Sequence, residues 1–184
     1  MDKNPFSTIL GASVNVYKEE FGEEAYLEGL ANKFVQKDPK NFSSVRSIVL
    51  DVHFRLETIL NIILKWYLCF YNKKKIFFSK EDYYKLGDVV SNIDYAKKLA
   101  IVELLKIFNK QTVKIFWKTN DLRVAFSHNY KKDSPKYLFY GESIFKRKSV
   151  DKLIDGLELV REEFLSFIVS EDDASPEVNP EFPV

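Results

Sequence analysis

The sequence is poor in the residues that build disulfides, metal centres and phosphate-binding loops. It has one cysteine, two histidines and six glycines in 184 residues. The single Cys69 cannot form an intramolecular disulfide, and its apolar surroundings indicate a packing role in a reducing compartment. The histidines and the cysteine lie too far apart for metal-ligand spacing, and the glycines form no phosphate-binding loop. We therefore expect no metal and no other cofactor.

Long apolar runs are also absent. The longest apolar segment, residues 56–70, is interrupted by Glu57, Asn61 and Lys65, so it is not expected to span a membrane. The N-terminus has an acidic residue early and only a short apolar stretch, which makes it a poor signal peptide. The sequence thus predicts a cytoplasmic protein with no membrane partner.

Basic residues are missing from one part of the chain, the C-terminal segment. Residues 170–184 hold five acidic side chains, three prolines and no lysine or arginine, which predicts a disordered or docking tail. The whole chain has a net charge of +1, so the part before this tail is mildly basic. Such a charge suits a polyanion such as RNA, or simply a solvated lysine-rich surface.

The remaining chain divides into an arm and a helical domain. Residues 1–42 form the arm, with an amphipathic stretch at 23–36 that could pack on the domain, cap a dimer or do neither. In residues 43–169, apolar side chains recur every three or four positions. Short connections between such segments predict an all-α fold, an antiparallel four- to five-helix bundle.

The expected helices of this domain have recognisable boundaries. Ser43 or Ser44 is expected to cap the first, Gly87 to end the second, and Ser149 to cap the last. The third is expected to begin at Asn92 or Asp94. The helical segments cover residues 43–71, 79–86, 92–108, 112–128 and 149–168.

The apolar repeat lapses between residues 131 and 148. The centre of this segment reads YLFYGESIF, which predicts a small aromatic hairpin or an irregular flap before the last helix. Interleaved aromatic and basic side chains are what single-stranded nucleic acid requires for stacking and phosphate neutralisation. A hairpin that packs on the bundle with its lysines in water is the alternative. The RNA-binding candidates are Lys131, Lys132, Lys146, Arg147 and Lys148.

A polar ridge is expected along the first helix. Arg46, His53 and Glu57 are spaced by seven and four residues, which places them on one flank. In one interpretation His53 is a boundary residue paired with Glu57. In the other, the ridge is the second wall of a functional site.

Reactive side chains are most concentrated in residues 120–130, NDLRVAFSHNY, at the end of a helical segment. A histidine with a pKa near 6.5 can take or give a proton, and an arginine presents a permanently charged planar fork to phosphate. Fraying of the last turn would bring Arg123 and His128 together. The alternative is a helix-end pair, with the imidazole near the helix dipole and Arg123 tied to Asp121 or Glu57.

The motif resembles a known signature. Arg123, four residues, His128, one residue and Tyr130 resemble the Arg-x4-His-x-Tyr motif of HEPN domains, particularly the toxin subunits partnered by minimal nucleotidyltransferases. The long helix before the motif and the last helix after it also look like that family, over residues 43–169. Val124 departs from the pattern, because active members often have a polar residue there.

The resemblance implies a metal-independent endoribonuclease, a toxin or defence component that cleaves RNA where two protomers of a homodimer place their motifs at a shared cleft. Arg123 and His128 would be catalytic, with Asn129 and Tyr130 in support, together with the ridge at Arg46, His53 and Glu57. Tyr130 resembles the tyrosine that a nucleotidyltransferase antitoxin adenylylates. Since many HEPN-like domains are noncatalytic, the alternative is an RNA-binding or protein-interaction module.

Overall fold

The computed structural model describes residues 42–70 and 80–173. This part of the chain is mostly helical, and a small hairpin precedes the last helix, so the predicted all-α bundle with its hairpin is confirmed. The amphipathic stretch at 23–36 lies outside the described residues, as do residues 174–184. The elements are α3 (Phe42–Phe70), α4 (Lys80–Ser91), α5 (Tyr95–Leu104), α6 (Lys110–Ser127), a 3-10 helix η1 (Pro135–Tyr137), β1 (Leu138–Phe139), β2 (Glu142–Ser143) and α7 (Arg147–Asp173).

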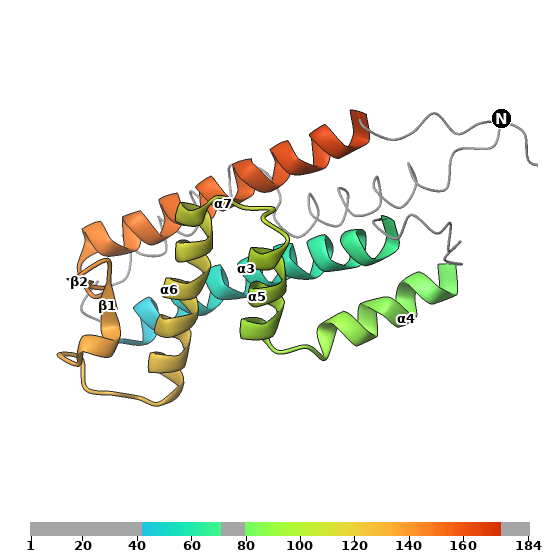
Figure 1. Cartoon of the computed structure of the whole chain (residues 1–184). Coiled ribbons are helices and arrows are strands. Elements are labelled where there is room, and N and C mark those ends of the chain that lie inside the picture. Colours follow the sequence, from blue (N-terminus) through green and yellow to red (C-terminus); the bar gives the residue numbers. More distant parts are fainter. Residues whose placement is uncertain (1–41, 71–79, 174–184) are drawn as a thin grey trace, which may run out of the picture.

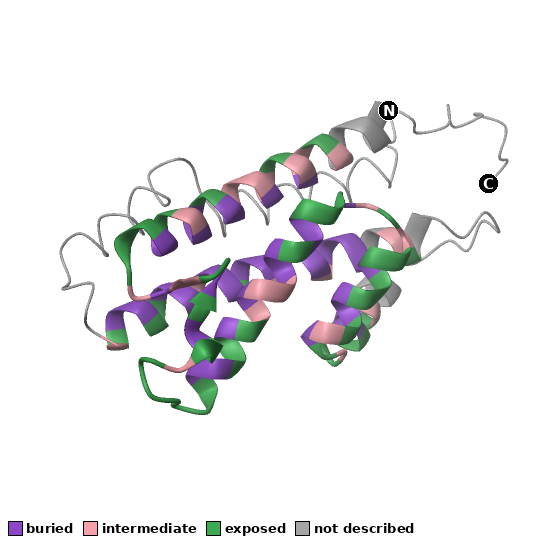
Figure 2. Ribbon diagram, turned by 60° about the vertical axis from the view of Figure 1, so that its left-hand side comes forward, coloured by how far each residue is buried: buried purple, intermediate pink, exposed green. Residues whose placement is uncertain are grey.

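Helix α3 is the centre of the bundle. It contacts α4, α5, α6 and α7, and Figure 1 shows α4 running back along it while α5 and α6 cross it. Helix α7 runs in the same direction as α3 (Figure 1). The three-and-four spacing of the α3 sequence explains this position, because most of its apolar side chains form one buried stripe (Figure 2), while Leu50, Phe54 and Leu68 are exposed. The fully buried members of the stripe are Val45, Val49, Val52, Leu56, Ile59, Leu60 and Ile63.

Capping side chains fix the starts of the two helices that cross α3. Asp94 caps α5 by accepting a hydrogen bond from the backbone of Lys97, as one of the two predicted starts requires. Asn109 caps α6 by accepting from the backbone of Thr112, among others. Glu163 of α7 in turn accepts hydrogen bonds from Asn109 and from the Thr112 hydroxyl. The orientation of α6, which carries the Arg/His motif, is thus tied to α7.

Two predicted caps are wrong. Helix α3 already includes Phe42, whose ring packs against Phe126 at 5.1 Å, so Ser44 is a buried helical residue and not a cap. Helix α7 begins at Arg147, and Ser149 is buried inside it with a hydroxyl that has no hydrogen-bond partner in the described part of the chain. Neither Ser44 nor Ser149 therefore caps its helix.

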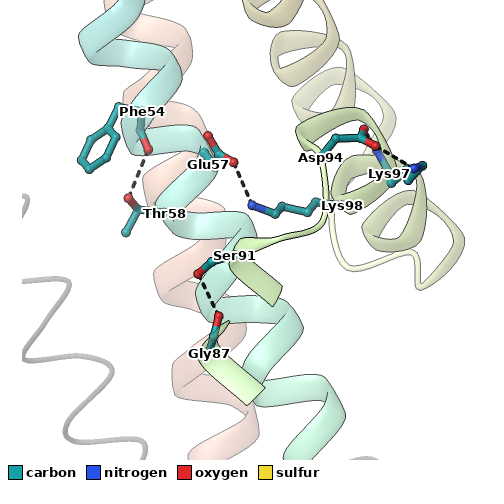
Figure 3. Close-up of polar contacts among 8 residues, drawn as sticks. All are labelled: Phe54, Glu57, Thr58, Gly87, Ser91, Asp94, Lys97 and Lys98. Carbon is teal, nitrogen blue, oxygen red and sulfur yellow. Dashed lines mark hydrogen bonds and ion pairs between the residues drawn. The ribbon is translucent and has the colours of Figure 1, made fainter. Parts of the chain in front are cut away.

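Three predicted helix ends are also wrong. Helix α5 ends at Leu104, before the predicted end at residue 108. Helix α4 continues through Gly87 to Ser91, whose hydroxyl donates to the Gly87 carbonyl at 2.8 Å (Figure 3). Gly87 instead gives space to Lys65 of α3, because a Cβ there would lie 3.1 Å from the lysine Nζ. At the other end of the chain, α7 extends to Asp173, so the first residues of the expected acidic tail are helical.

The hairpin is short and anchored on the bundle. Leu138 pairs with Ser143 and Phe139 with Glu142, joined by a two-residue turn. Both turn residues, Tyr140 (φ 49°) and Gly141 (φ 83°), have the positive φ of a type I′ turn. The inward-facing side chains of this region are fully buried, whereas its lysines are exposed.

No helix in residues 42–70 and 80–173 combines the length and the apolar character needed to cross a bilayer.

Candidate functional site

The Arg/His motif lies where α6 ends. Arg123 is on the penultimate turn, and His128 follows the last helical residue, with its backbone N–H donating to the Val124 carbonyl at 3.2 Å. Asn129 then takes a left-handed conformation (φ 49°), which is a common way to end a helix. The chain therefore turns away from the α6 axis directly after His128, and the His128 and Tyr130 rings lie 5.9 Å apart.

A buried tyrosine holds this turn in place. The Tyr137 hydroxyl lies 3.2 Å from the Ala125 carbonyl and 3.1 Å from the Tyr130 carbonyl, so it can donate to either side of the motif. Its ring packs on Phe126 at 4.8 Å. Burial raises the pKa of Tyr137, and the charge of nearby Arg46 opposes that rise. Arg46, the first residue of the predicted ridge, therefore lies at the motif end of α3.

Both catalytic candidates are open to solvent. Arg123 and His128 are exposed, and in the described part of the chain no carboxylate forms an ion pair with Arg123. The predicted ties of Arg123 are wrong, because Asp121 pairs with Lys118 at 3.5 Å and Glu57 with Lys98 at 2.8 Å. The guanidinium is thus available to an anion from solution.

His53, by contrast, is buried. Only 6% of it is exposed, its ring stacks on Tyr95 at 4.3 Å, and its Nε2 has no hydrogen-bond partner among residues 42–70 and 80–173. Burial lowers the pKa of His53, the Glu57 charge raises it, and the Arg123 charge lowers it further. His53 is therefore a buried residue stacked on Tyr95 of α5 and does not line an open site.

The expected pairing of His53 with Glu57 is also replaced by a contact between helices. The Glu57 carboxylate instead accepts a hydrogen bond from Lys98 of α5, which is only 1% exposed (Figure 3). Lys98 is a residue that the sequence reasoning missed. Its spacing from Tyr95 and Val102 would have placed it on the buried face of α5.

Burial of His53 makes stability depend on pH. Because the pKa of His53 in the folded state is below its ordinary value of about 6.5, the unfolded chain binds the proton more readily. The stabilising contribution of neutral His53 is expected to be complete above pH 6.5 and to be lost as the pH falls through the lowered folded-state pKa. Urea unfolding at several pH values measures this loss. In His53→Phe, which keeps an aromatic ring against Tyr95, the acid-side fall should shrink, and an unchanged fall would contradict the assignment.

The RNA-binding candidates gather beside the motif. All five are exposed, and Lys131 and Lys132 directly follow Tyr130. The Lys132 ammonium lies over the Phe145 ring at 5.5 Å, which brings it next to the second basic run, residues 146–148. Arg147 at the start of that run makes a long ion pair with Asp151 at 3.9 Å. Two basic runs that are separate in the sequence thus form one surface.

The fold and site together define an all-α protein with an exposed Arg/His/Tyr constellation at a helix end. No family model, no curated protein and no solved structure matches this chain. Its residues and their geometry are therefore the basis for a functional assignment.

Proposed function

We propose that this protein is a HEPN-like endoribonuclease that cleaves RNA without a metal at Arg123 and His128. The observation that carries the proposal is the exposure of both side chains at the end of α6, with no carboxylate paired to Arg123 within the described ranges. His128 takes the proton from a ribose 2′-hydroxyl, whose oxygen attacks the phosphorus. Arg123 stabilises the added charge on the phosphate oxygens, and the bond to the 5′-oxygen breaks.

The products fix the proton balance of this reaction. The 2′-oxygen ends in a cyclic phosphate, and the departing 5′-oxygen must receive a proton from a general acid. One His128 cannot supply base and acid at the same moment, and His53 is too deeply buried to reach RNA. This supports a homodimer in which the second copy supplies the second imidazole.

The neighbours of His128 give the proposal a mode of control. Asn129 would orient the phosphate, and Tyr130 is 41% exposed with its ring 5.9 Å from that of His128. An adenylyl group attached to the Tyr130 hydroxyl would place an anion beside the imidazole and block RNA. A nucleotidyltransferase antitoxin is accordingly proposed as a partner, which would make the protein a toxin or defence component.

The experiment that tests the activity is cleavage of labelled single-stranded RNA in EDTA. We expect fragments that end in 2′,3′-cyclic phosphate, and no cleavage of the same RNA carrying 2′-O-methyl groups, because the nucleophile is then blocked. Cleavage of the methylated RNA, or cleavage that needs added metal, would contradict the mechanism.

A noncatalytic RNA-binding module is the second candidate, favoured by Val124 in the motif and by the exposed basic surface. In Lys146→Glu/Lys148→Glu, we expect weaker RNA binding and a salt dependence shallower by about 1.4 in log–log slope, since each phosphate contact on single strands contributes about 0.7. Fluorescence anisotropy across a salt series measures both. Lys106→Glu/Lys110→Glu is the matched control, because it makes the same charge change at two exposed positions, one in the α5–α6 connection and one at the start of α6. An equal effect in the two variants would show that RNA binding depends on the total charge of the protein and not on this basic surface.

A further inference from the structure

The turn of the hairpin has a tyrosine where tyrosine is unfavourable. Tyr140 occupies the first central position of the type I′ turn with φ 49°, a position that normally takes Asn, Asp or Gly. Bulky residues rarely adopt positive φ, and such strained positions concentrate at functional sites. Gly141 follows with φ 83°, so an ordinary Asn-Gly turn would fit this hairpin without strain. The tyrosine at the tip therefore makes the backbone of this turn less favourable than asparagine would.

The surroundings of the ring prepare it for a ligand. Tyr140 is 40% exposed, and the Lys114 ammonium of α6 lies 5.3 Å from its ring centroid. The Phe139 ring, which is fully buried, supports it from one edge at 4.7 Å. The Tyr140 ring thus reaches solvent, packs on a buried phenylalanine and has an ammonium over it. Such a ring can stack on a base, and the ammonium can neutralise the neighbouring phosphate.

Helix α6 connects this ring to the motif. The hairpin lies alongside α6, with Tyr137 at its base reaching the Ala125 carbonyl and Tyr140 at its tip reaching Lys114 (Figure 1). Lys114 and His128 are fourteen residues apart, which corresponds to about 20 Å along the helix axis. A single strand would cover that distance with a few nucleotides, so the ring and the reacting phosphate can belong to one RNA.

We propose that Tyr140 and Lys114 form a base-stacking subsite for single-stranded RNA, a few nucleotides from the phosphate at Arg123 and His128. This inference rests on the proposed function, because it assumes that RNA is the ligand. Charge favours RNA over a protein partner, since residues 129–148 carry six basic and two acidic side chains. Stacking also needs no particular sequence, because every base has a π-face.

The test uses the full chain carrying His128→Ala, so that bound RNA is not cut. Tyr140→Asn removes the ring but supplies a residue that the turn prefers, and it should not lower the midpoint of thermal unfolding. We expect it to weaken binding of labelled single-stranded RNA roughly tenfold, as loss of one stacked base does. Tyr140→Phe is the matched control and should bind as the parent does. Lys114→Gln should weaken binding and flatten its salt dependence.

Two outcomes would overturn the subsite. Equal affinity of Tyr140→Asn and its parent would exclude stacking on this ring and leave Tyr140 as a contact for a protein. An equal loss on double-stranded RNA would also exclude stacking, because paired bases offer no free face. Either result leaves the proposed function standing if the unmodified chain still cleaves RNA in EDTA. Conversely, the unmodified chain could fail to cleave RNA while Tyr140→Asn still weakens RNA binding. The stacking subsite would then stand, and the protein would be an RNA-binding module.

Discussion

Replacing His128 with alanine should lower the rate of RNA cleavage by at least about 100-fold, because a positioned proton-transfer group contributes a factor of roughly 10² to 10⁴. In a symmetric dimer the substitution removes the base and the acid together, so the upper part of that range is expected. The fold should be unaffected. His128 is exposed, its ring lies 5.9 Å from the Tyr130 ring, and its backbone bond to Val124 survives the change.

The measurement is the initial rate on labelled RNA in EDTA, with circular dichroism to confirm the helical content. Gln111→Ala is the matched control, since this exposed side chain lies on the same helix at the opposite end from the motif. A rate that survives in His128→Ala would remove this residue from the mechanism and return the protein to the binding-module hypothesis. A loss that is equal in both variants would point to damage of α6 rather than of the site.

The candidate site could be placed at a helix end from the sequence because its residues are close together in the chain. Arg123, His128 and Tyr130 fall within eight residues, and the end of a helical repeat predicts that they lie at a helix terminus. The structure gives each a different neighbour. Arg123 acts electrostatically on His53 while His128 lies against Tyr130, and no hydrogen bond joins Arg123 to His128 among the described residues. Convergence of the two on one phosphate is therefore proposed across a dimer.

The positions of the main helices and of the hairpin were also predictable from the sequence. The three-and-four apolar spacing placed α3 and α6 nearly to the residue. The aromatic runs around Gly141-Glu142-Ser143 predicted the hairpin, whose turn lies at Tyr140 and Gly141. Contacts between residues far apart in the sequence were not predictable. The Phe42 ring of α3, for example, packs on Phe126 of α6. The role of Tyr137, which reaches carbonyls on both sides of His128, has no local signal at all.

The pairing of Glu57 shows that residue spacing within one helix does not predict contacts between helices. Its four-residue separation from His53 favours a pair within the helix, which is typically worth a few tenths of a kcal/mol. Lys98 lies 41 residues away in sequence and is nearly inaccessible to water. Its buried ammonium therefore gains more from a carboxylate partner than the His53 imidazole would. Glu57 therefore pairs with the buried Lys98 ammonium and not with His53. This pairing cannot be predicted from the sequence, because it depends on how α5 crosses α3.

Removing the Glu57 carboxylate should therefore destabilise this bundle strongly. Glu57→Gln leaves the Lys98 ammonium, 1% exposed, without its counter-charge. Loss of one partner of a buried pair costs about 3–5 kcal/mol, and we expect the lower end because the Glu57 side chain is 32% exposed. Urea unfolding followed by circular dichroism measures the free energy of unfolding.

The double variant separates the charge from the shape. Lys98→Met removes the buried cation but keeps a long apolar chain, and replacing a buried pair by apolar groups is often neutral or stabilising. Glu57→Gln/Lys98→Met should therefore be more stable than Glu57→Gln alone, because no unpaired charge remains between α3 and α5. If the double variant were as unstable as the single one, the loss would come from packing of the two side chains. The pair would then fix the crossing of α5 over α3 by its shape rather than by its charge.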